Sequence, residues 1–266
     1  MRRYISSNQN ILIYENTKHI APVCDAPSTK QFLDIHHALP TETRSIRVEV
    51  VNGDTLDVAE RFLVRTPLVM NLADDRVPGG CVEVGACSQE ECLFRRTNLF
   101  KSLVPSLYPI RYNEAIYSPS ISVFKRGEND LYASMPPFKV DFIACPGLKH
   151  PEIINGHLKE NDRNTLLNKI RLIFQVANQF GHTVIVAGAL GCGAWCNPPQ
   201  DVASAFKQII EEEENNNANR VTEVIFAILK PKPMGLYNPS WENNNFEVFN
   251  ATFNGVSEVS PGIVFN

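Results

Sequence analysis

The sequence lacks the features of a membrane or secreted protein. Its 266 residues contain no run near the roughly 18 uninterrupted apolar residues of a spanning helix. The basic start Met1-Arg2-Arg3 is followed by polar residues and not by the apolar segment of a secretory signal. The seven cysteines form no paired Cys-x-x-Cys framework, which favours free thiols. We therefore expect a cytoplasmic protein that binds no membrane, with a nuclear location also open.

Excess positive charge is also missing. A formal net charge of −4 argues against a general nucleic-acid-binding surface. The only basic doublet near the motifs discussed below, Arg95-Arg96, fits a solvated or phosphate-facing side of a helix. Four cysteines could be considered as zinc ligands, namely Cys87, Cys92, Cys192 and Cys196. Their spacing matches that of no structural zinc finger. We expect no metal, no cofactor and a monomer.

Apolar runs and helical stripes alternate from residue 45 to residue 230. The pattern predicts strands at residues 45–51, 67–72, 115–117, 121–124, 140–145, 183–187 and 221–229. It predicts helices at residues 55–62, 89–103 and 201–214, and a further helix with an apolar stripe at residues 166–177 that ends before Gly181. Such alternation favours an α/β fold in which helices cover both faces of a sheet. No repeat or linker divides this part, so we expect one domain over 45–230.

The two ends of the chain are predicted to be extensions. Residues 1–44 contain an apolar run at 11–14 and a possible helix around 31–38, punctuated by prolines. We expect this segment to pack on the main domain. Residues 231–266 carry an asparagine tract at 243–245 and are irregular in sequence. We expect them to form strands or loops.

Two glycine-rich loops each follow a predicted buried strand and precede a helix. The first contains Pro78-Gly79-Gly80-Cys81 and leads to Gln89-Glu90-Glu91, and the second is Gly191-Cys192-Gly193-Ala194-Trp195. Backbone amides beside a helix N-terminus bind anions, so a diphosphate fits both loops. Neither loop has the Lys-Ser/Thr ending of a P-loop or the dinucleotide pattern GxGxxG. A tight turn explains either loop alone, and complementing the helix dipole explains the acidic pair alone.

Taken together, these motifs resemble the microbial-type poly(ADP-ribose) glycohydrolases, a branch of the macrodomain fold. The glycine loop with Gln89-Glu90-Glu91 and the second loop with Asn197-Pro198-Pro199 carry the resemblance. Weaker matches at Tyr117-Ser118-Pro119 and Val140-Asp141 extend it over residues 45–230. The resemblance implies a three-layer α/β/α macrodomain-like sandwich with a mixed central sheet and terminal extensions.

The resemblance also implies an activity, the hydrolysis of ribose–ribose O-glycosidic bonds in poly(ADP-ribose). Glu91 matches the family's catalytic acid/base, and Glu90 matches the neighbouring acid that helps to hold the distal ribose. An acid of this kind needs a raised pKa, which burial and an adjacent carboxylate supply. Consecutive helical residues point about 100° apart, so the two carboxyls cannot flank a bond as paired sugar-hydrolase acids do. One carboxyl acting twice fits better.

Substrate-binding residues follow from the resemblance position by position. Asn71 and Asp74 would lie beside the distal ribose, although Asn71 could simply end a strand. Asp54 would recognise adenine or cap a helix. Trp195 would stack on the ligand or pack within its loop. The remaining predicted contacts with substrate are Gly79, Gly80, Cys81, Gln89, Gly191, Cys192, Gly193 and Ala194.

One position departs from the family pattern, because Cys81 stands where a third glycine is usual. A side chain there would strain the loop if the position required a positive φ, or it would crowd the diphosphate. Three functions therefore stay open: a poly(ADP-ribose) glycohydrolase, a mono-ADP-ribosyl hydrolase, and a non-catalytic ADP-ribose-binding macrodomain. In each, the partner is ADP-ribose or its polymer attached to protein.

Overall fold

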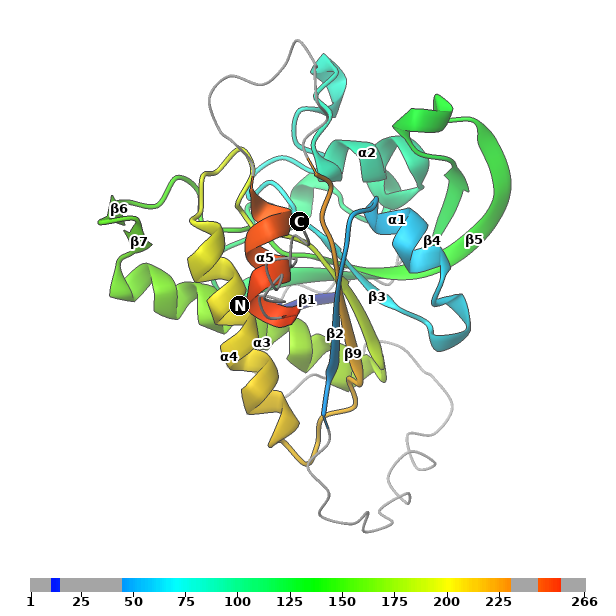
Figure 1. Ribbon diagram of the computed structural model, residues 1–266. Coiled ribbons are helices and arrows are strands. Elements are labelled where there is room, and N and C mark those ends of the chain that lie inside the picture. The colour runs from blue at the N-terminus through cyan, green and yellow to red at the C-terminus, as the bar shows by residue number, and fades with distance from the viewer. Residues whose placement is uncertain (1–10, 15–44, 231–243, 255–266) are drawn as a thin grey trace, which may run out of the picture.

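The computed structural model describes residues 11–14, 45–230 and 244–254. Its centre is a seven-stranded sheet with the order β1-β4-β5-β3-β8-β9-β2, covered by helices on both faces (Figure 1). The strands of this sheet are β1 (Ile11–Tyr14), β2 (Arg47–Val51), β3 (Leu68–Asn71), β4 (Glu114–Lys125), β5 (Ser134–Ala144), β8 (Val184–Ala187) and β9 (Glu223–Ala227). The three-layer fold with a mixed sheet is as predicted.

Helices divide between the two faces of the sheet (Figure 1). One face carries the short α1 and α2, and the other carries the longer α3, α4 and α5. The helices are α1 (Thr55–Glu60), α2 (Gln89–Arg96), α3 (Glu160–Phe180), α4 (Pro199–Glu214) and α5 (Asn245–Asn254). Helix α3 ends as predicted at Gly181, whose φ of +77° suits glycine.

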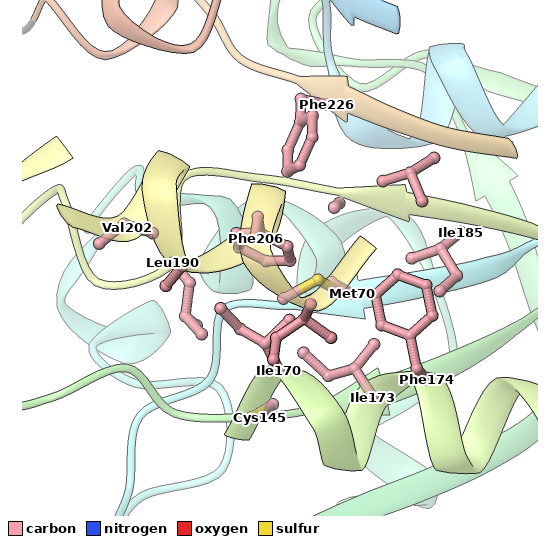
Figure 2. Close-up of a cluster of buried hydrophobic side chains, with 14 of the residues drawn as sticks. Met70, Cys145, Ile170, Ile173, Phe174, Ile185, Leu190, Val202, Phe206 and Phe226 are labelled. Carbon is pink, nitrogen blue, oxygen red and sulfur yellow. The ribbon is translucent and has the colours of Figure 1, made fainter. Parts of the chain in front are cut away.

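Strand side chains alternate between two apolar cores. In β3, Leu68 and Met70 belong to the core under α3 and α4, whereas Val69 belongs to the core under α1 and α2. Strand β8 alternates in the same way, because successive side chains of a strand point to opposite faces. Figure 2 shows the first core, where Phe206 of α4 and Phe226 of β9 approach edge to face with centroids 5.0 Å apart.

Strand direction places the site. Strands β2, β9, β8, β3 and β5 are parallel, and β4 is antiparallel to β5. The carboxyl ends of the parallel strands therefore meet at one edge of the sheet, and the loops that follow them are brought together there. Ligands of open α/β sheets bind at this edge.

Several predicted elements differ from the structure. The helix expected over residues 89–103 ends at Arg96 because Thr97 adopts an extended backbone and bridges to Val123 of β4. The two short strands expected around residue 119 form the single strand β4, which continues through a register shift at Ser120 (φ +54°). The strand expected at 140–145 begins earlier, at Ser134. The loop expected up to residue 161 contains a small hairpin, β6 (Ile153–Ile154) and β7 (His157–Leu158).

The terminal segments are only partly described. The apolar run at residues 11–14 forms β1, which pairs antiparallel with β4 at the sheet edge. The possible helix around residues 31–38 lies outside the described residues. The tail was expected to form strands or loops, but residues 245–254 form α5, because Phe249 packs into the aromatic cluster of Phe226 and Phe206.

Replacing Phe249 with alanine tests this packing. The side chain is fully buried, and its ring contacts Phe226 with centroids 5.0 Å apart. We expect Phe249→Ala to lower the free energy of unfolding by about 3–5 kcal/mol through lost burial and a residual cavity. Urea denaturation measures the loss. Glu247→Ala on the exposed side of α5 is the control and should cost less than about 1 kcal/mol. Equal effects of both changes would show that α5 does not depend on this contact.

Candidate active site

A cleft of about 550 Å³ lies at the carboxyl ends of the parallel strands. This volume is within the range of small-molecule sites, roughly 300–1,000 Å³. Eleven predicted site residues line the cleft, namely Asp54, Asp74, Gly80, Cys81, Gln89, Glu90, Glu91, Gly191, Gly193, Ala194 and Trp195. The other three predicted residues, Asn71, Gly79 and Cys192, are buried behind it. The structure thus brings both glycine loops and the acidic pair to one place.

Glu90 is a buried carboxyl that joins three segments. Its Oε2 accepts a hydrogen bond from the Asp74 amide (2.7 Å), and its Oε1 accepts from Asn71 Nδ2 (3.1 Å) and the Gly79 amide (3.3 Å). Burial raises the pKa of Glu90 to about 7, which the three hydrogen bonds oppose and the neighbouring Glu91 charge assists. Asn71 therefore positions this carboxyl as well as ending β3.

Glu91 also is buried, with 6% of its surface exposed, but it is held from one side only. Its Oε1 accepts a hydrogen bond from the Cys81 amide at 3.0 Å. Its buried Oε2 has no hydrogen-bond partner among the residues that the structure describes. One oxygen is therefore fixed by the first glycine loop, while the other has unused hydrogen-bonding capacity at the wall of the cleft.

Gly79 and Gly80 are required for different reasons. Both have a positive φ, +77° and +55°. A Cβ atom on Gly80 would lie 2.6 Å from Glu91 Oε1, so only glycine lets the loop approach this carboxyl. A Cβ atom on Gly79 would lie 2.5 Å from the ring of Phe94. The amides of Gly79 and Cys81 donate to the two carboxyls, whereas the sequence predicted that this loop would bind diphosphate.

Cys81 does not strain the loop. Its φ is −101°, an ordinary value for a residue with a side chain. The side chain is exposed and its residue lines the cleft, so the concern about crowding a ligand stands while the concern about backbone strain is removed.

Gln89 fixes the start of α2 against β3 and α1. Its Oε1 accepts from the Leu72 amide (2.8 Å), and its Nε2 donates to the Met70 carbonyl (2.8 Å) and to Thr55 Oγ1 (3.2 Å). Both N–H donors of the amide and its oxygen are thus bonded to neighbouring segments. This explains why glutamine precedes the acidic pair.

The second glycine loop is shaped by Asn197. Its Nδ2 donates to the carbonyls of Leu148 (2.6 Å) and Gly191 (3.0 Å). Gly191 has a φ of +73°, and its Cα lies only 2.7 Å from the place that a Cβ on Gly147 would take. In the described part of the chain, the amides of Gly193, Ala194 and Trp195 donate to no backbone or side-chain acceptor. This loop therefore offers amides to a ligand, unlike the first.

Asp54 caps α1, as the alternative interpretation held. Its Oδ1 accepts from the amides of Leu56 (2.8 Å) and Asp57 (3.2 Å) and also from Arg96. Because Asp54 also lines the cleft, the cap does not conflict with the predicted contact with adenine.

The expectation that Arg95-Arg96 face solvent or phosphate was wrong. Arg96 is buried, and it binds Asp54, Asp57 (2.6 Å) and the Lys125 carbonyl (3.1 Å). Arg95 donates to the Ala86 carbonyl of the first glycine loop at 2.5 Å. These partners are distant in sequence, so the local pattern of charge did not reveal them.

Two residues near Asp74 were not predicted from the sequence. Lys149 Nζ lies 3.5 Å from Asp74 Oδ2, 2.8 Å from Asp75 Oδ1 and 5.2 Å from the centroid of Trp195. Tyr108 has a buried hydroxyl with no hydrogen-bond partner among the described residues, and burial and then the charges of Glu90 and Asp74 raise its pKa. No sequence motif marks either position.

Within the described ranges, no group of three or more histidine, cysteine or acidic side chains is placed to hold a metal ion. The described helices also include none that is long and apolar enough to cross a bilayer. Six cysteines, Cys81, Cys87, Cys92, Cys145, Cys192 and Cys196, are free thiols.

Fold and cleft together define a macrodomain-like protein. Residues 4–126 match the family model described as microbial-type PARG, catalytic domain, where PARG denotes poly(ADP-ribose) glycohydrolase. The matched range includes the first glycine loop and Gln89-Glu90-Glu91, and it ends before the second glycine loop. The predicted resemblance to this family is confirmed.

Solved structures of bacterial PARG proteins extend the likeness. The Thermomonospora curvata protein bound to the inhibitor ADP-HPD is 26% identical to this chain and has a TM-score of 0.67. The match covers 79% of this chain and 80% of the T. curvata chain. Another structure of that protein gives a TM-score of 0.68 at 26% identity, and the match covers 81% of this chain and 79% of that one. The structure of the Deinococcus radiodurans protein in complex with ADP-ribose is 24% identical and has a TM-score of 0.64. The match covers 80% of this chain and 87% of that one, and it supports the fold. No curated protein sequence matches the chain significantly.

We expect Glu90→Gln to change how stability depends on pH. Burial raises the pKa of Glu90 to about 7 in the folded protein, against 4.5 for an ordinary glutamate, so the folded state binds the proton more tightly. Its contribution is full below about pH 4.5 and is lost as the pH rises to about 7, amounting to up to about 3 kcal/mol. Urea denaturation across this interval should show a smaller fall in stability for Glu90→Gln than for wild type.

Exposed Glu83 provides the matched control for this measurement. Glu83→Gln removes the same charge from the surface, and we expect it to keep the wild-type dependence on pH. The assignment fails if Glu90→Gln and Glu83→Gln give the same slope.

Proposed function

We propose that the protein is an ADP-ribosyl glycohydrolase that cleaves ribose–ribose O-glycosidic bonds of poly(ADP-ribose), with Glu91 as acid/base. The observation that carries this proposal is the Glu91 carboxyl, buried at the wall of the cleft with one oxygen held by the Cys81 amide and the other without a partner among the described residues. The family match supports the reaction type. The similar T. curvata poly(ADP-ribose) glycohydrolase binds the inhibitor ADP-HPD, and this likeness supports the proposed reaction.

In the proposed reaction, the protonated Glu91 carboxyl donates its proton to the oxygen of the departing ribose. The bond between that oxygen and the anomeric carbon breaks, and its electron pair stays on the oxygen. Water then attacks the oxocarbenium-like ribose, and the Glu91 carboxylate takes the proton released. The carboxyl ends as it began, so one residue serves as acid and then as base.

The position of the acidic pair favours this single-residue scheme over paired acids. A Cβ on Gly80 would lie 2.6 Å from Glu91 Oε1 and 3.4 Å from Glu90 Oε2, so both carboxyls converge on one loop. Paired acids of sugar hydrolases instead flank the scissile bond. We assign Glu90 a positioning role, holding the loop and the distal ribose, because its oxygens accept three protein hydrogen bonds.

We assign the diphosphate to the second glycine loop. The amides of Gly193, Ala194 and Trp195 donate to no described acceptor, and α4 begins just beyond this loop at Pro199. Unpaired amides grouped in a loop attract anions. The Trp195 ring lines the cleft and can stack on ribose or adenine, while Asp54 lies at another part of the same wall.

Two other functions use the same cleft. Hydrolysis of single ADP-ribosyl groups requires the same carboxyl and differs in the leaving group. A reader that binds ADP-ribose without turnover would follow if the Cys81 side chain kept the bond away from Glu91. We favour the hydrolase, since Cys81 imposes no backbone strain and its amide holds Glu91.

Inside the cell, the partner would be a protein carrying ADP-ribose polymer. Exposed free thiols at Cys81, Cys87 and Cys196 support a reducing, cytoplasmic setting. We propose a monomer, since the cleft is formed within one chain.

Glu91→Gln tests the acid/base role. Glutamine keeps an oxygen for the Cys81 amide but cannot donate and recover the proton, so we expect turnover of poly(ADP-ribose) to fall by about a hundred- to ten-thousandfold. Release of ADP-ribose from modified protein measures turnover, and calorimetry should show that free ADP-ribose still binds. Glu83→Gln, in the 3-10 turn after the same loop, should retain full activity. Undiminished turnover in Glu91→Gln would reject the mechanism.

Cys81→Gly distinguishes the hydrolase from the reader. The φ of −101° does not require glycine, so we expect little change in stability and turnover within about threefold of wild type. The assay uses polymer and single-unit substrates in parallel. Wild type could bind free ADP-ribose but release none from either substrate, while Cys81→Gly gains this hydrolytic activity. In that case the protein is better described as a non-catalytic reader of ADP-ribose.

A further inference from the structure

A second cavity of about 550 Å³ adjoins the cleft, and Gly147 lines both. Its wall carries four cationic side chains and one carboxylate: Arg76, Arg111, Lys149, Lys169 and Asp75. The whole chain has a net charge of −4, so this concentration of cations is not a general property of its surface. Arg76 and Lys149 both pair with Asp75, at 3.6 and 2.8 Å, so the four cations leave an excess of positive charge in the cavity. A concave site with an excess of one sign of charge attracts ligands of the opposite sign.

The cavity approaches the cleft at Gly147 and near Asp74. Lys149 lies 3.5 Å from the Asp74 carboxylate, and the Asp74 amide bonds Glu90 at 2.7 Å. Tyr108, whose hydroxyl is buried without a described partner, also lines the cavity. Lys149 therefore links the cations of this cavity to the segment that holds Glu90, next to the proposed acid/base Glu91.

The cavity also contains a built, buried cation. Lys169 of α3 is 1% exposed, and its ammonium lies 5.8 Å from the ring centroid of Tyr112, another lining residue. Burying an ammonium is costly, so it persists where the surroundings favour it. Arg111 and Arg76 are exposed at the rim.

The proposed substrate explains this arrangement. Each unit of poly(ADP-ribose) carries two phosphates, and cleavage at the terminal unit releases a chain whose next diphosphate lies one nucleoside away from the broken bond. We propose that the second cavity binds the diphosphate of this penultimate unit, so that the enzyme prefers a chain over a single ADP-ribosyl group. This inference rests on the proposed function and names its substrate class.

Binding of one- and two-unit ligands tests the inference. In a Glu91→Gln background, which prevents turnover, calorimetry compares ADP-ribose with a two-unit fragment of the polymer. We expect the two-unit fragment to bind about tenfold tighter. Adding Arg111→Gln should remove most of that gain and leave ADP-ribose affinity within about twofold, because Arg111 lines only the second cavity.

Arg220→Gln is the matched control. Arg220 is exposed and precedes β9, at the end of the sheet opposite the cleft. The same loss of charge there should leave both affinities unchanged. Raising the salt concentration should weaken two-unit binding more with Arg111 present than after Arg111→Gln, since the ionic contribution is screened.

The inference is overturned if both ligands bind equally, or if Arg111→Gln or Arg220→Gln weakens both alike. Polymer hydrolysis by wild type is measured in parallel. Absence of hydrolysis would reject the proposed function, whereas hydrolysis with no two-unit preference would reject the second cavity alone.

Discussion

The hydrogen bonds on the buried Glu90 carboxyl hold the site together. Through Asn71 they engage the end of β3, through Asp74 the segment after it, and through Gly79 the first glycine loop. Gln89, one residue earlier, ties the same helix end to Leu72 and Met70. The first turn of α2 is thus held by hydrogen bonds from both Gln89 and Glu90. These bonds also fix the position of Glu91, the next residue of the helix.

The two glycine-rich loops have similar sequences but use their backbone amides differently. The first uses its amides internally, on Glu90 and Glu91, and its glycines are needed for a positive φ and for close approach to a carboxyl and to Phe94. The second is shaped from behind by Asn197, and three of its amides have no described acceptor. The first loop therefore positions the acidic pair, and the second is the loop whose amides are left for a ligand, although the glycine pattern predicted an anion site in both.

Sequence reasoning succeeded where the cause was local. The buried strands β3 and β8 were predictable because every apolar residue in them faces one core or the other, and the end of α3 because Gly181 takes a left-handed turn. Thr97 ended α2 early by bridging to a strand 26 positions later, which no helical stripe could reveal. Arg96 and Lys149 were missed for the same reason, since their partners lie far away in sequence.

Negative charge around the cleft is the remaining constraint. Four acids line it, and a diphosphate would be repelled if all were exposed and ionised. Arg96 pairs with Asp54, Lys149 lies 3.5 Å from Asp74, and burial raises the pKa of Glu90 to about 7. Asp54, Asp74 and Glu90 are thus compensated by different means, whereas the second oxygen of Glu91 has no described partner. An anionic ligand can therefore approach this acidic cleft, because the charges around Glu91 are offset.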